Sequence, residues 1–198
     1  MGDFYPLHIR PSETTFLKQI KAFENDWKPY NPRTENKRFG LSLTSLDGGM
    51  GGVPDLDSLR EYNIANNTEY GEMDFKTPTK AYSGISCLTE RLEPLAPFIG
   101  RSHVLRFDAG GYFPPHRDSN FMRSDNFRII GFFGCTHHTM HMALDNEILS
   151  FEKGRYYFLN TKRAHSLVSF QDNSYCVVFN IQLCDETADF MAQYTFAK

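Results

Sequence analysis

Short apolar runs separated by turn residues fill the second half of the chain. From residue 101 onward each run is rich in β-branched and aromatic residues, and Gly, Asn or Asp follows closely. Such spacing is typical of strands joined by short turns. Eight runs in close order predict an antiparallel sandwich or barrel of the jelly-roll kind. The runs are SHVLRFDAGG, YFPPH, FRIIGFFGC, HMALD, EILSFEKG, RYYFLN, AHSLVSF and NSYCVVFNIQL.

The first hundred residues have a less regular pattern. Ser12, a residue type that often caps helix N-termini, precedes apolar residues at helical spacing. Residues 38–46 alternate between apolar and polar and predict a strand. Residues 86–100 predict a helix that stops at its final glycine. A further helix is predicted over residues 185–198, after the last strand.

Length and composition fit one globular domain. The chain has 198 residues, of which 40% are apolar and 15% aromatic, so it can bury a sizeable core. We expect a mainly β domain over residues 1–198. It comprises a helical and irregular support region on the substrate side (1–100), the β-core (101–184) and a C-terminal helix (185–198).

Charge and hydropathy argue against two classes of partner. The net charge is −3 and the Lys and Arg residues form no dense block, which argues against a nucleic-acid partner. No apolar run approaches the ~20 residues of a membrane span, and the first residues lack the apolar region of a secretory signal. We therefore expect a cytoplasmic protein with four free cysteine thiols, none of them in a C-x-x-C pair. The sequence predicts no particular oligomeric state.

The stretch PPHRD contains a candidate metal-binding pair. Alternate residues of a strand face the same side, so His116 and Asp118 point together. His165 begins a later run, 47 residues beyond Asp118, and in a jelly roll such distant strands can be neighbours. Two imidazoles and one carboxylate on one face of an iron ion leave three positions open, as in the facial triad of non-haem iron oxygenases.

These motifs resemble a known enzyme family. The run RFDAGGYFPPHRDSN, the strand NFRIIGFF and the segment LSFEKGRYYFLNTKRAHSLVSF are similar to those of Fe(II)- and 2-oxoglutarate-dependent oxygenases. They are most similar to the aspartyl/asparaginyl β-hydroxylase-like branch, which includes free proline hydroxylases. The resemblance covers about the second half of the chain, from residue 101 to residue 183.

The resemblance implies a fold, a site and a reaction. It implies a double-stranded β-helix, with the cupin-like jelly roll as its core. Iron is then held by His116, Asp118 and His165, with 2-oxoglutarate as cosubstrate and dioxygen as oxidant. Oxidative decarboxylation of 2-oxoglutarate is coupled to hydroxylation of an aliphatic C–H bond. The implied substrate is a small molecule or short peptide, namely a free or peptidyl amino acid.

A cation is needed for the distal carboxylate of 2-oxoglutarate. Residues 166–197 contain no Arg or Lys, although many family members place this Arg about ten residues after the distal histidine. Arg128, in an apolar run, is the preferred anchor, because an inward-facing cation there would require an anion. Arg106 is the second candidate, and hydroxyl groups such as that of Ser174 are candidates for additional hydrogen bonds. Arg117 and Arg123 are candidates for a substrate carboxylate.

Three alternatives stay open at this point. The segment CTHHTMH places Cys135, His137 and His141 on one side of an extended chain, as in a zinc site. A cupin-like metal-binding or sensing protein would bind the metal without turnover. A nucleic-acid dealkylase could use the same core but would require a basic groove, which the acidic balance of the chain opposes.

Overall fold

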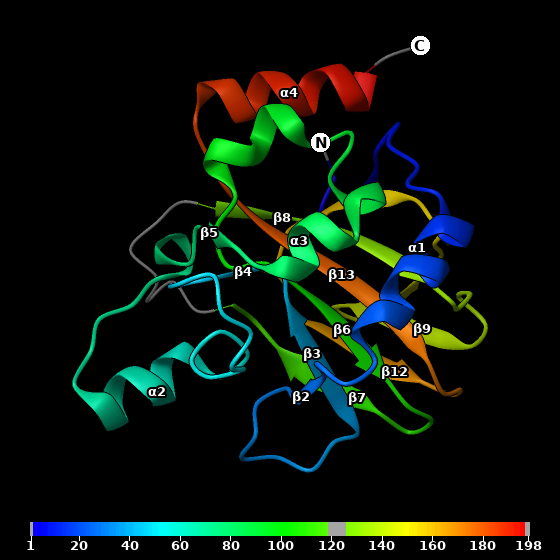
Figure 1. Ribbon diagram of the computed structural model, residues 1–198. Coiled ribbons are helices and arrows are strands. Elements are labelled where there is room, and N and C mark those ends of the chain that lie inside the picture. Colours follow the sequence, from blue (N-terminus) through cyan, green and yellow to red (C-terminus); the bar gives the residue numbers. More distant parts are fainter. Residues whose placement is uncertain (1, 119–125, 197–198) are drawn as a thin grey trace.

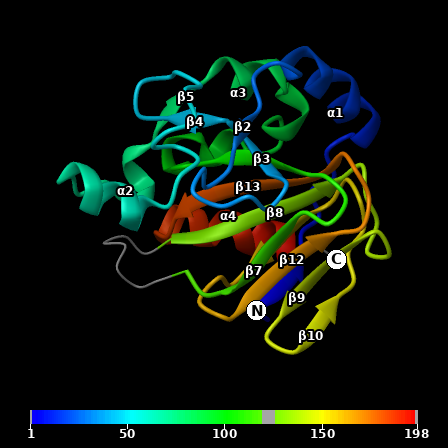
Figure 2. The same ribbon diagram turned by 90° about the horizontal axis from the view of Figure 1, so that it is seen from below.

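Two antiparallel sheets pack face to face in the body of the molecule (Figures 1 and 2). The computed structural model describes residues 2–118 and 126–196. The larger sheet has the order β1 (Phe4–Pro6), β11 (Tyr156–Leu159), β8 (Asn126–Phe133), β13 (Ser174–Gln182), β6 (His103–Phe107), β3 (Arg38–Ser42) and β2 (Lys28–Pro29). The smaller sheet has the order β10 (Glu147–Leu149), β9 (Met140–Leu144), β12 (His165–Ser169) and β7 (Tyr112–His116).

The eight strands from β6 to β13 form a double-stranded β-helix. Each sheet takes four of them: β6, β8, β11 and β13 in the larger sheet, and β7, β9, β10 and β12 in the smaller. Each strand coincides with one of the eight apolar runs of the second half of the sequence, although β8 and β9 begin one residue before their runs. The prediction of a mainly β, jelly-roll fold is confirmed.

Strand β13 shows why some of the predicted strands are nearly continuous apolar segments. Its residues are buried on both faces, because the larger sheet has a packed layer on each side. Cys176 and Val178 point into the sandwich, whereas Val177 and Phe179 pack against the helical layer. The two hydrophobic clusters therefore lie on opposite faces of the same sheet.

Helical segments cover the outer face of the larger sheet, as Figure 2 shows from below. Ser12 caps the first helix as predicted, since its Oγ accepts a hydrogen bond from the backbone N–H of Thr15. The covering segments are α1 (Glu13–Gln19), η1 (Ile20–Phe23), α3 (Lys80–Gly84), η3 (Ser86–Leu88), η4 (Glu93–Phe98) and α4 (Asp185–Phe196).

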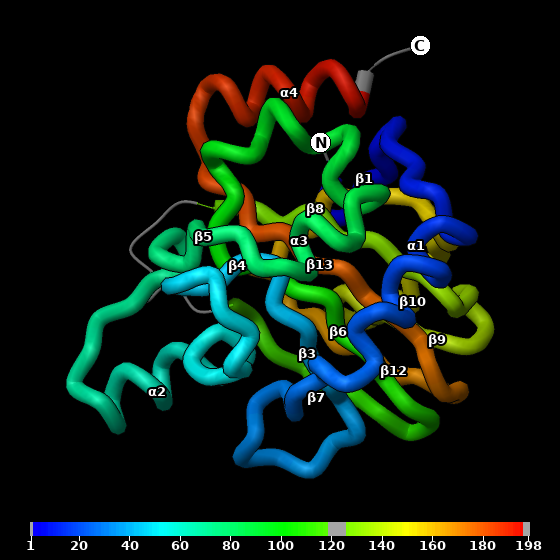
Figure 3. Tube along the Cα trace, viewed as in Figure 1, coloured from blue at the N-terminus to red at the C-terminus, as the bar shows by residue number. Residues whose placement is uncertain are grey.

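The remaining N-terminal elements lie toward one end of the sandwich. Strands β4 (Thr44–Ser45) and β5 (Thr77–Pro78) form a small antiparallel sheet in the support region, and η2 (Glu72–Asp74) directly precedes β5 in the chain. Helix α2 (Leu59–Asn66) projects from the body of the molecule (Figure 3). No helix in the described part of the chain combines the length and the apolar character needed to cross a membrane.

One predicted helix is wrong. Residues 86–100 form two short 3-10 turns, η3 and η4, instead of one continuous helix. Pro94 and Pro97 lack the N–H that an α-helix would use for its ladder, so the segment tightens into short turns. Its apolar residues Leu88, Leu92 and Leu95 are nevertheless buried.

Candidate metal centre

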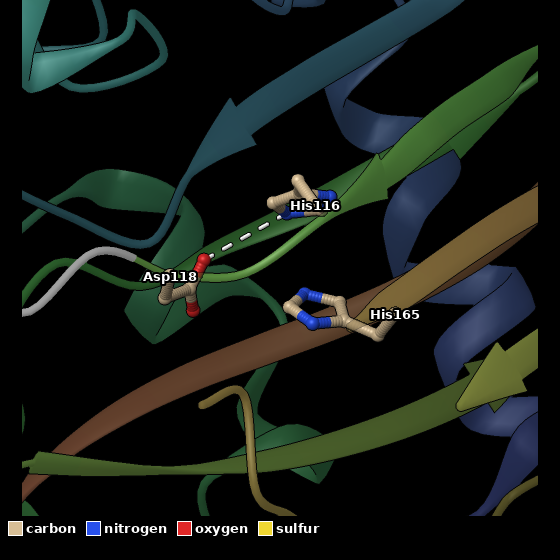
Figure 4. Close-up of side chains that lie close together, drawn as sticks. All are labelled: His116, Asp118 and His165. Atoms are coloured by element: carbon tan, nitrogen blue, oxygen red, sulfur yellow. Dashed lines mark ion pairs between the residues drawn. The ribbon is translucent and has the colours of Figure 1, made fainter. Parts of the chain in front are cut away.

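The smaller sheet brings the three predicted ligands together. His116 ends β7, Asp118 follows two residues later, and His165 begins the neighbouring strand β12, directly opposite His116. One ligand atom from each residue lies within 4.8 Å of those of the others. His116 Nε2 and Asp118 Oδ1 are 3.7 Å apart. Figure 4 shows the three side chains turned toward a shared space.

Backbone carbonyls orient both imidazoles for metal binding. His116 Nδ1 lies 2.8 Å from the carbonyl oxygen of Pro114, and His165 Nδ1 lies 3.0 Å from that of Arg163. A carbonyl only accepts hydrogen bonds, so each Nδ1 must carry the proton. Each Nε2 is then left with a free lone pair, as a metal ligand requires. The residues therefore fit a divalent iron ion with nitrogen and oxygen ligands.

The electrostatics keep the two imidazoles neutral. Burial, followed by the neighbouring His165, lowers the pKa of His116 to about 4. Burial also lowers the pKa of His165 below its usual value. Neutral imidazole is the form that binds metal, so neither histidine must lose a proton at neutral pH to do so.

Asp118 is the anionic member of the triad. Burial acts to raise its pKa, but the nearby Arg128 charge and then His165 lower it overall. Arg128 Nη2 lies 2.9 Å from Asp118 Oδ2. Oδ1 lies on the side of His116, whereas Oδ2 faces Arg128 but is buried without a hydrogen-bond partner among the described residues.

The larger sheet faces the triad with a row of polar side chains. Arg128 of β8 lies opposite Asn180 of β13 in the register, and Asn180 donates a hydrogen bond to the carbonyl of Arg101. Glu72 of η2 joins this row: Asn180 Nδ2 donates to its Oε2 at 2.7 Å. Its Oε1 lies 3.6 Å from Arg101 and 3.7 Å from Arg128. Glu72 thus holds two buried guanidinium groups beside the metal centre.

A cavity of about 50 Å³ lies between the sheets beside the triad. His116, His165 and Arg128 form part of its lining, together with Tyr30 and His103. Burial lowers the pKa of His103 well below its usual value, so this side chain is neutral. The other lining residues are mostly apolar, among them Leu105, Ile130, Met142, Cys176 and Val178.

Only one of the three predicted cosubstrate-binding residues lies at the triad. Arg128 lines the cavity, and its Nε is buried without a hydrogen-bond partner among the described residues. Arg106 lies on the opposite face of the larger sheet, where its guanidinium stacks 5.1 Å from the Trp27 ring. Ser174 lies at the far end of β13 and bonds to Ser169. The structure does not bring Arg106 or Ser174 to the candidate ligands. Arg106 points to the other face because side chains alternate along β6, and Ser174 lies too far along β13.

Of the two arginines considered for a substrate carboxylate, the structure describes only Arg117. Arg117 is exposed to solvent, which follows from strand alternation, since its neighbours His116 and Asp118 point inward. Arg123 falls outside the described residues.

The zinc alternative has no support in the described residues. Cys135 is buried, with its Sγ 3.8 Å from Met140 Sδ, and burial raises the pKa of its thiol to about 12. His137 faces the carbonyl oxygen of Phe151 at 3.3 Å. Within the described ranges, His116, Asp118 and His165 are the group whose ligand atoms converge on one point.

Sequence reasoning missed the polar row on the larger sheet. Glu72 and Arg101 come from segments without a recognisable motif, and only the folded chain brings them to Arg128. Arg38 was also missed, although it is buried beside Phe113. The one signal in the sequence is that Arg38 is the charged residue at the start of the predicted strand over residues 38–46.

Comparisons with known proteins agree with this fold. No family model matches the chain, and no curated protein matches it in sequence. A prolyl hydroxylase from Trichoplax adhaerens, solved with a hypoxia-inducible factor peptide, has a similar structure. It is 10% identical, with a TM-score of 0.51 over 91% of this chain and 84% of that chain. At this identity the likeness shows the fold.

Two further solved structures have a weaker likeness to this chain. The ribosomal oxygenase YcfD from Escherichia coli, solved with cobalt and 2-oxoglutarate, is 13% identical. It matches 56% of this chain and 33% of its own, with a TM-score of 0.38. An RmlC-like cupin from Desulfovibrio desulfuricans is also 13% identical, over 41% of this chain and 71% of its own, with a TM-score of 0.32. Neither score is high enough to support an argument about this chain.

Replacing Glu72 with alanine is expected to lower the free energy of unfolding by about 3–5 kcal/mol, since it leaves two buried guanidinium groups without their shared carboxylate. Urea denaturation measures the change. Glu147→Ala, at an exposed position of β10, is the control and should stay within about 0.5 kcal/mol of the parent. A loss below about 1 kcal/mol for Glu72→Ala would mean that the guanidinium groups find other compensation.

Proposed function

We propose that this protein is an Fe(II)- and 2-oxoglutarate-dependent oxygenase that hydroxylates an aliphatic C–H bond of a free or peptidyl amino acid. The observation that carries the proposal is the triad itself: two imidazoles with free Nε2 atoms and one carboxylate converge beside a cavity. Three protein ligands of this kind leave metal positions open for a chelating cosubstrate and dioxygen.

The reaction balances with these components. Bound Fe(II) supplies the redox chemistry, with 2-oxoglutarate as the two-electron reductant of dioxygen. One oxygen atom of dioxygen enters succinate as carbon dioxide leaves, and the other enters the new hydroxyl group of the substrate. The protein supplies ligation, orientation and a site from which bulk water is excluded.

Arg128 is the proposed anchor for the distal carboxylate of 2-oxoglutarate. It lines the cavity, its buried Nε has no partner among the described residues, and it contacts the triad through Asp118. A guanidinium can bind one carboxylate with one edge and a second carboxylate with another. Arg128 would therefore orient the metal ligand and the cosubstrate together.

The aromatic residues of the cavity orient His116 and limit the access of water. Phe113 stacks on the His116 ring with centroids 4.4 Å apart, and Tyr30 lies beside Phe113 at 5.7 Å. These rings fix the orientation of His116 and keep water from one side of the cavity. Less water strengthens the attraction between Arg128 and a bound carboxylate.

A second candidate function is metal binding without turnover. It is favoured by the small volume of the cavity and by its largely apolar lining, which leaves little room for a dicarboxylate unless side chains move. It is also favoured by the pairing of Arg128 with Asp118 and Glu72, because two carboxylates already share this cation. In that case the metal centre would serve as a sensor or a structural element.

Succinate formation separates the two functions. The purified protein is supplied with Fe(II), ascorbate and 2-oxoglutarate, and free amino acids and short peptides are screened for stimulated succinate release. We expect at least one amino acid or peptide to raise the rate several-fold above the rate without substrate, with His165→Ala as the inactive control. Metal binding without stimulation by any amino acid, peptide or methylated oligonucleotide would favour the second candidate.

A further inference from the structure

Arg38 is a buried cation that has no carboxylate partner in the part of the chain that the structure describes. Only 3% of its surface is exposed, at the start of β3 on the face that packs toward the smaller sheet. No carboxylate among the described residues pairs with it, whereas Arg101 and Arg128 both contact Glu72. Burial lowers the pKa of its guanidinium to about 10. A buried charge without a counter-ion is costly and points to an anion that completes the site.

The guanidinium lies one aromatic ring away from a metal ligand. Its central carbon is 3.7 Å from the centroid of the Phe113 ring and 4.9 Å from that of Tyr30. Phe113 in turn stacks on His116 at 4.4 Å. Tyr30, Phe113 and His116 all line the cavity. Arg38 itself is not among the residues that line this cavity, and the Phe113 ring separates its guanidinium from His116.

Part of the hydrogen-bonding capacity of Arg38 is unused. One Nη donates to the backbone carbonyl of Tyr112 at 3.0 Å. The buried Nε has no partner among the described residues. Cation–π contacts with Phe113 and Tyr30 hold the planar group in place. An oriented guanidinium with an open donor is suited to receive a carboxylate.

We propose that Arg38 binds a carboxylate group of the substrate, so that the substrate class is a small carboxylic acid such as a free amino acid. This rests on the proposed oxygenase function. The substrate is favoured over the cosubstrate because Arg38 lies on the far side of Phe113 from His116 and beside the half-exposed Tyr112. A cosubstrate chelated to the metal lies on the inner side of that ring, where Arg128 is available.

Arg106 provides a matched control within the same chain. Its guanidinium also stacks on two aromatic rings, at 4.6 Å from Phe39 and 5.1 Å from Trp27, but on the opposite face of the sheet. It also has a carboxylate nearby, since Asp108 lies 3.8 Å away. An anion that binds specifically at Arg38 should leave Arg106 unaffected.

The test follows the Nε–H signals of both arginines by NMR in the ¹⁵N-labelled full chain. Zn(II) replaces iron as a diamagnetic metal, and Arg38→Lys and Arg106→Lys assign the two signals. 2-Oxoglutarate is titrated first, and acetate or acetamide is then added at constant ionic strength. We expect saturable movement of the Arg38 signal by acetate, with a Kd of about 1–10 mM, no response to acetamide, and no movement of the Arg106 signal.

Two results would overturn the proposal in different ways. If 2-oxoglutarate itself moves the Arg38 signal and acetate then has no effect, the carboxylate at Arg38 belongs to the cosubstrate. If acetate moves neither signal, Arg38 has a structural role at the edge of the sandwich. Failure of 2-oxoglutarate to bind at all would count against the proposed function. The acetate titration of the Zn(II)-loaded protein would still decide whether Arg38 binds carboxylates.

Discussion

Replacing His165 with alanine is expected to abolish specific Fe(II) binding and, with it, every trace of stimulated succinate release. His165 supplies one of three converging ligand atoms, and its Nδ1 is fixed by the carbonyl oxygen of Arg163. Loss of a partner that merely orients a ligand costs about 10–100-fold in metal affinity. Loss of the ligand itself should therefore cost more than about 100-fold. Anaerobic titration with Co(II), followed by its visible absorption, measures the affinity directly.

A second histidine of the same sheet serves as the control. His141 lies on β9, next to β12, where it is paired with Val168 and packs against the Phe170 ring. His141→Ala removes an imidazole of equal size without touching the triad, so Co(II) affinity should remain at the parent value. Full metal occupancy in the His165→Ala variant would exclude His165 as a ligand. Equal losses in both variants would indicate a folding defect.

The metal triad could be read from sequence because two of its members are close neighbours. His116 and Asp118 share one face through strand alternation alone, and His165 opens the strand that pairs with β7. The eight core strands were predictable for a similar reason, since short apolar runs with turn residues between them leave few alternatives. Features set by residues that are close in the sequence can therefore be predicted without the fold.

The alternation of side chains along β6 explains why the sequence alone could not place Arg106. β6 is buried on both faces, so its pattern does not reveal which side faces the smaller sheet. For this reason Arg106 was the second candidate after Arg128, yet it points to the outer face and stacks on Trp27. Only the three-dimensional pairing of β6 with β13 decides the matter.

The contacts of the support region could not be predicted because their partners are far apart in the chain. Glu72 lies in a 3-10 turn 56 residues before Arg128 in the chain, and no spacing rule connects the two. Their contact exists because η2 folds against β13 near Asn180, which bonds to Glu72. The sequence therefore predicted the three candidate ligands and Arg128, but not Glu72 and Arg101, which lie beside Arg128 in the fold.

Arg128→Gln is expected to weaken 2-oxoglutarate binding by about 30–150-fold while the metal site survives. Charge-assisted, bidentate hydrogen bonds to a carboxylate contribute about 2–3 kcal/mol, which corresponds to that range of Kd. Metal affinity should fall by about 10-fold at most, because a bound metal ion replaces the positive charge that Arg128 places beside Asp118. Titration calorimetry with Mn(II) and 2-oxoglutarate, without oxygen, measures both constants in one protein.

Two further variants separate charge from geometry. Arg128→Lys keeps the positive charge but loses the planar pair of donors, so its affinity for 2-oxoglutarate should fall between those of the parent and Arg128→Gln. Arg106→Gln removes a guanidinium from the outer face of the same sheet and should leave both constants unchanged. If Arg128→Gln bound 2-oxoglutarate as tightly as the parent, Arg128 would not be the anchor. Arg38 would then be the remaining buried guanidinium near the cavity, among the described residues, without a carboxylate of its own.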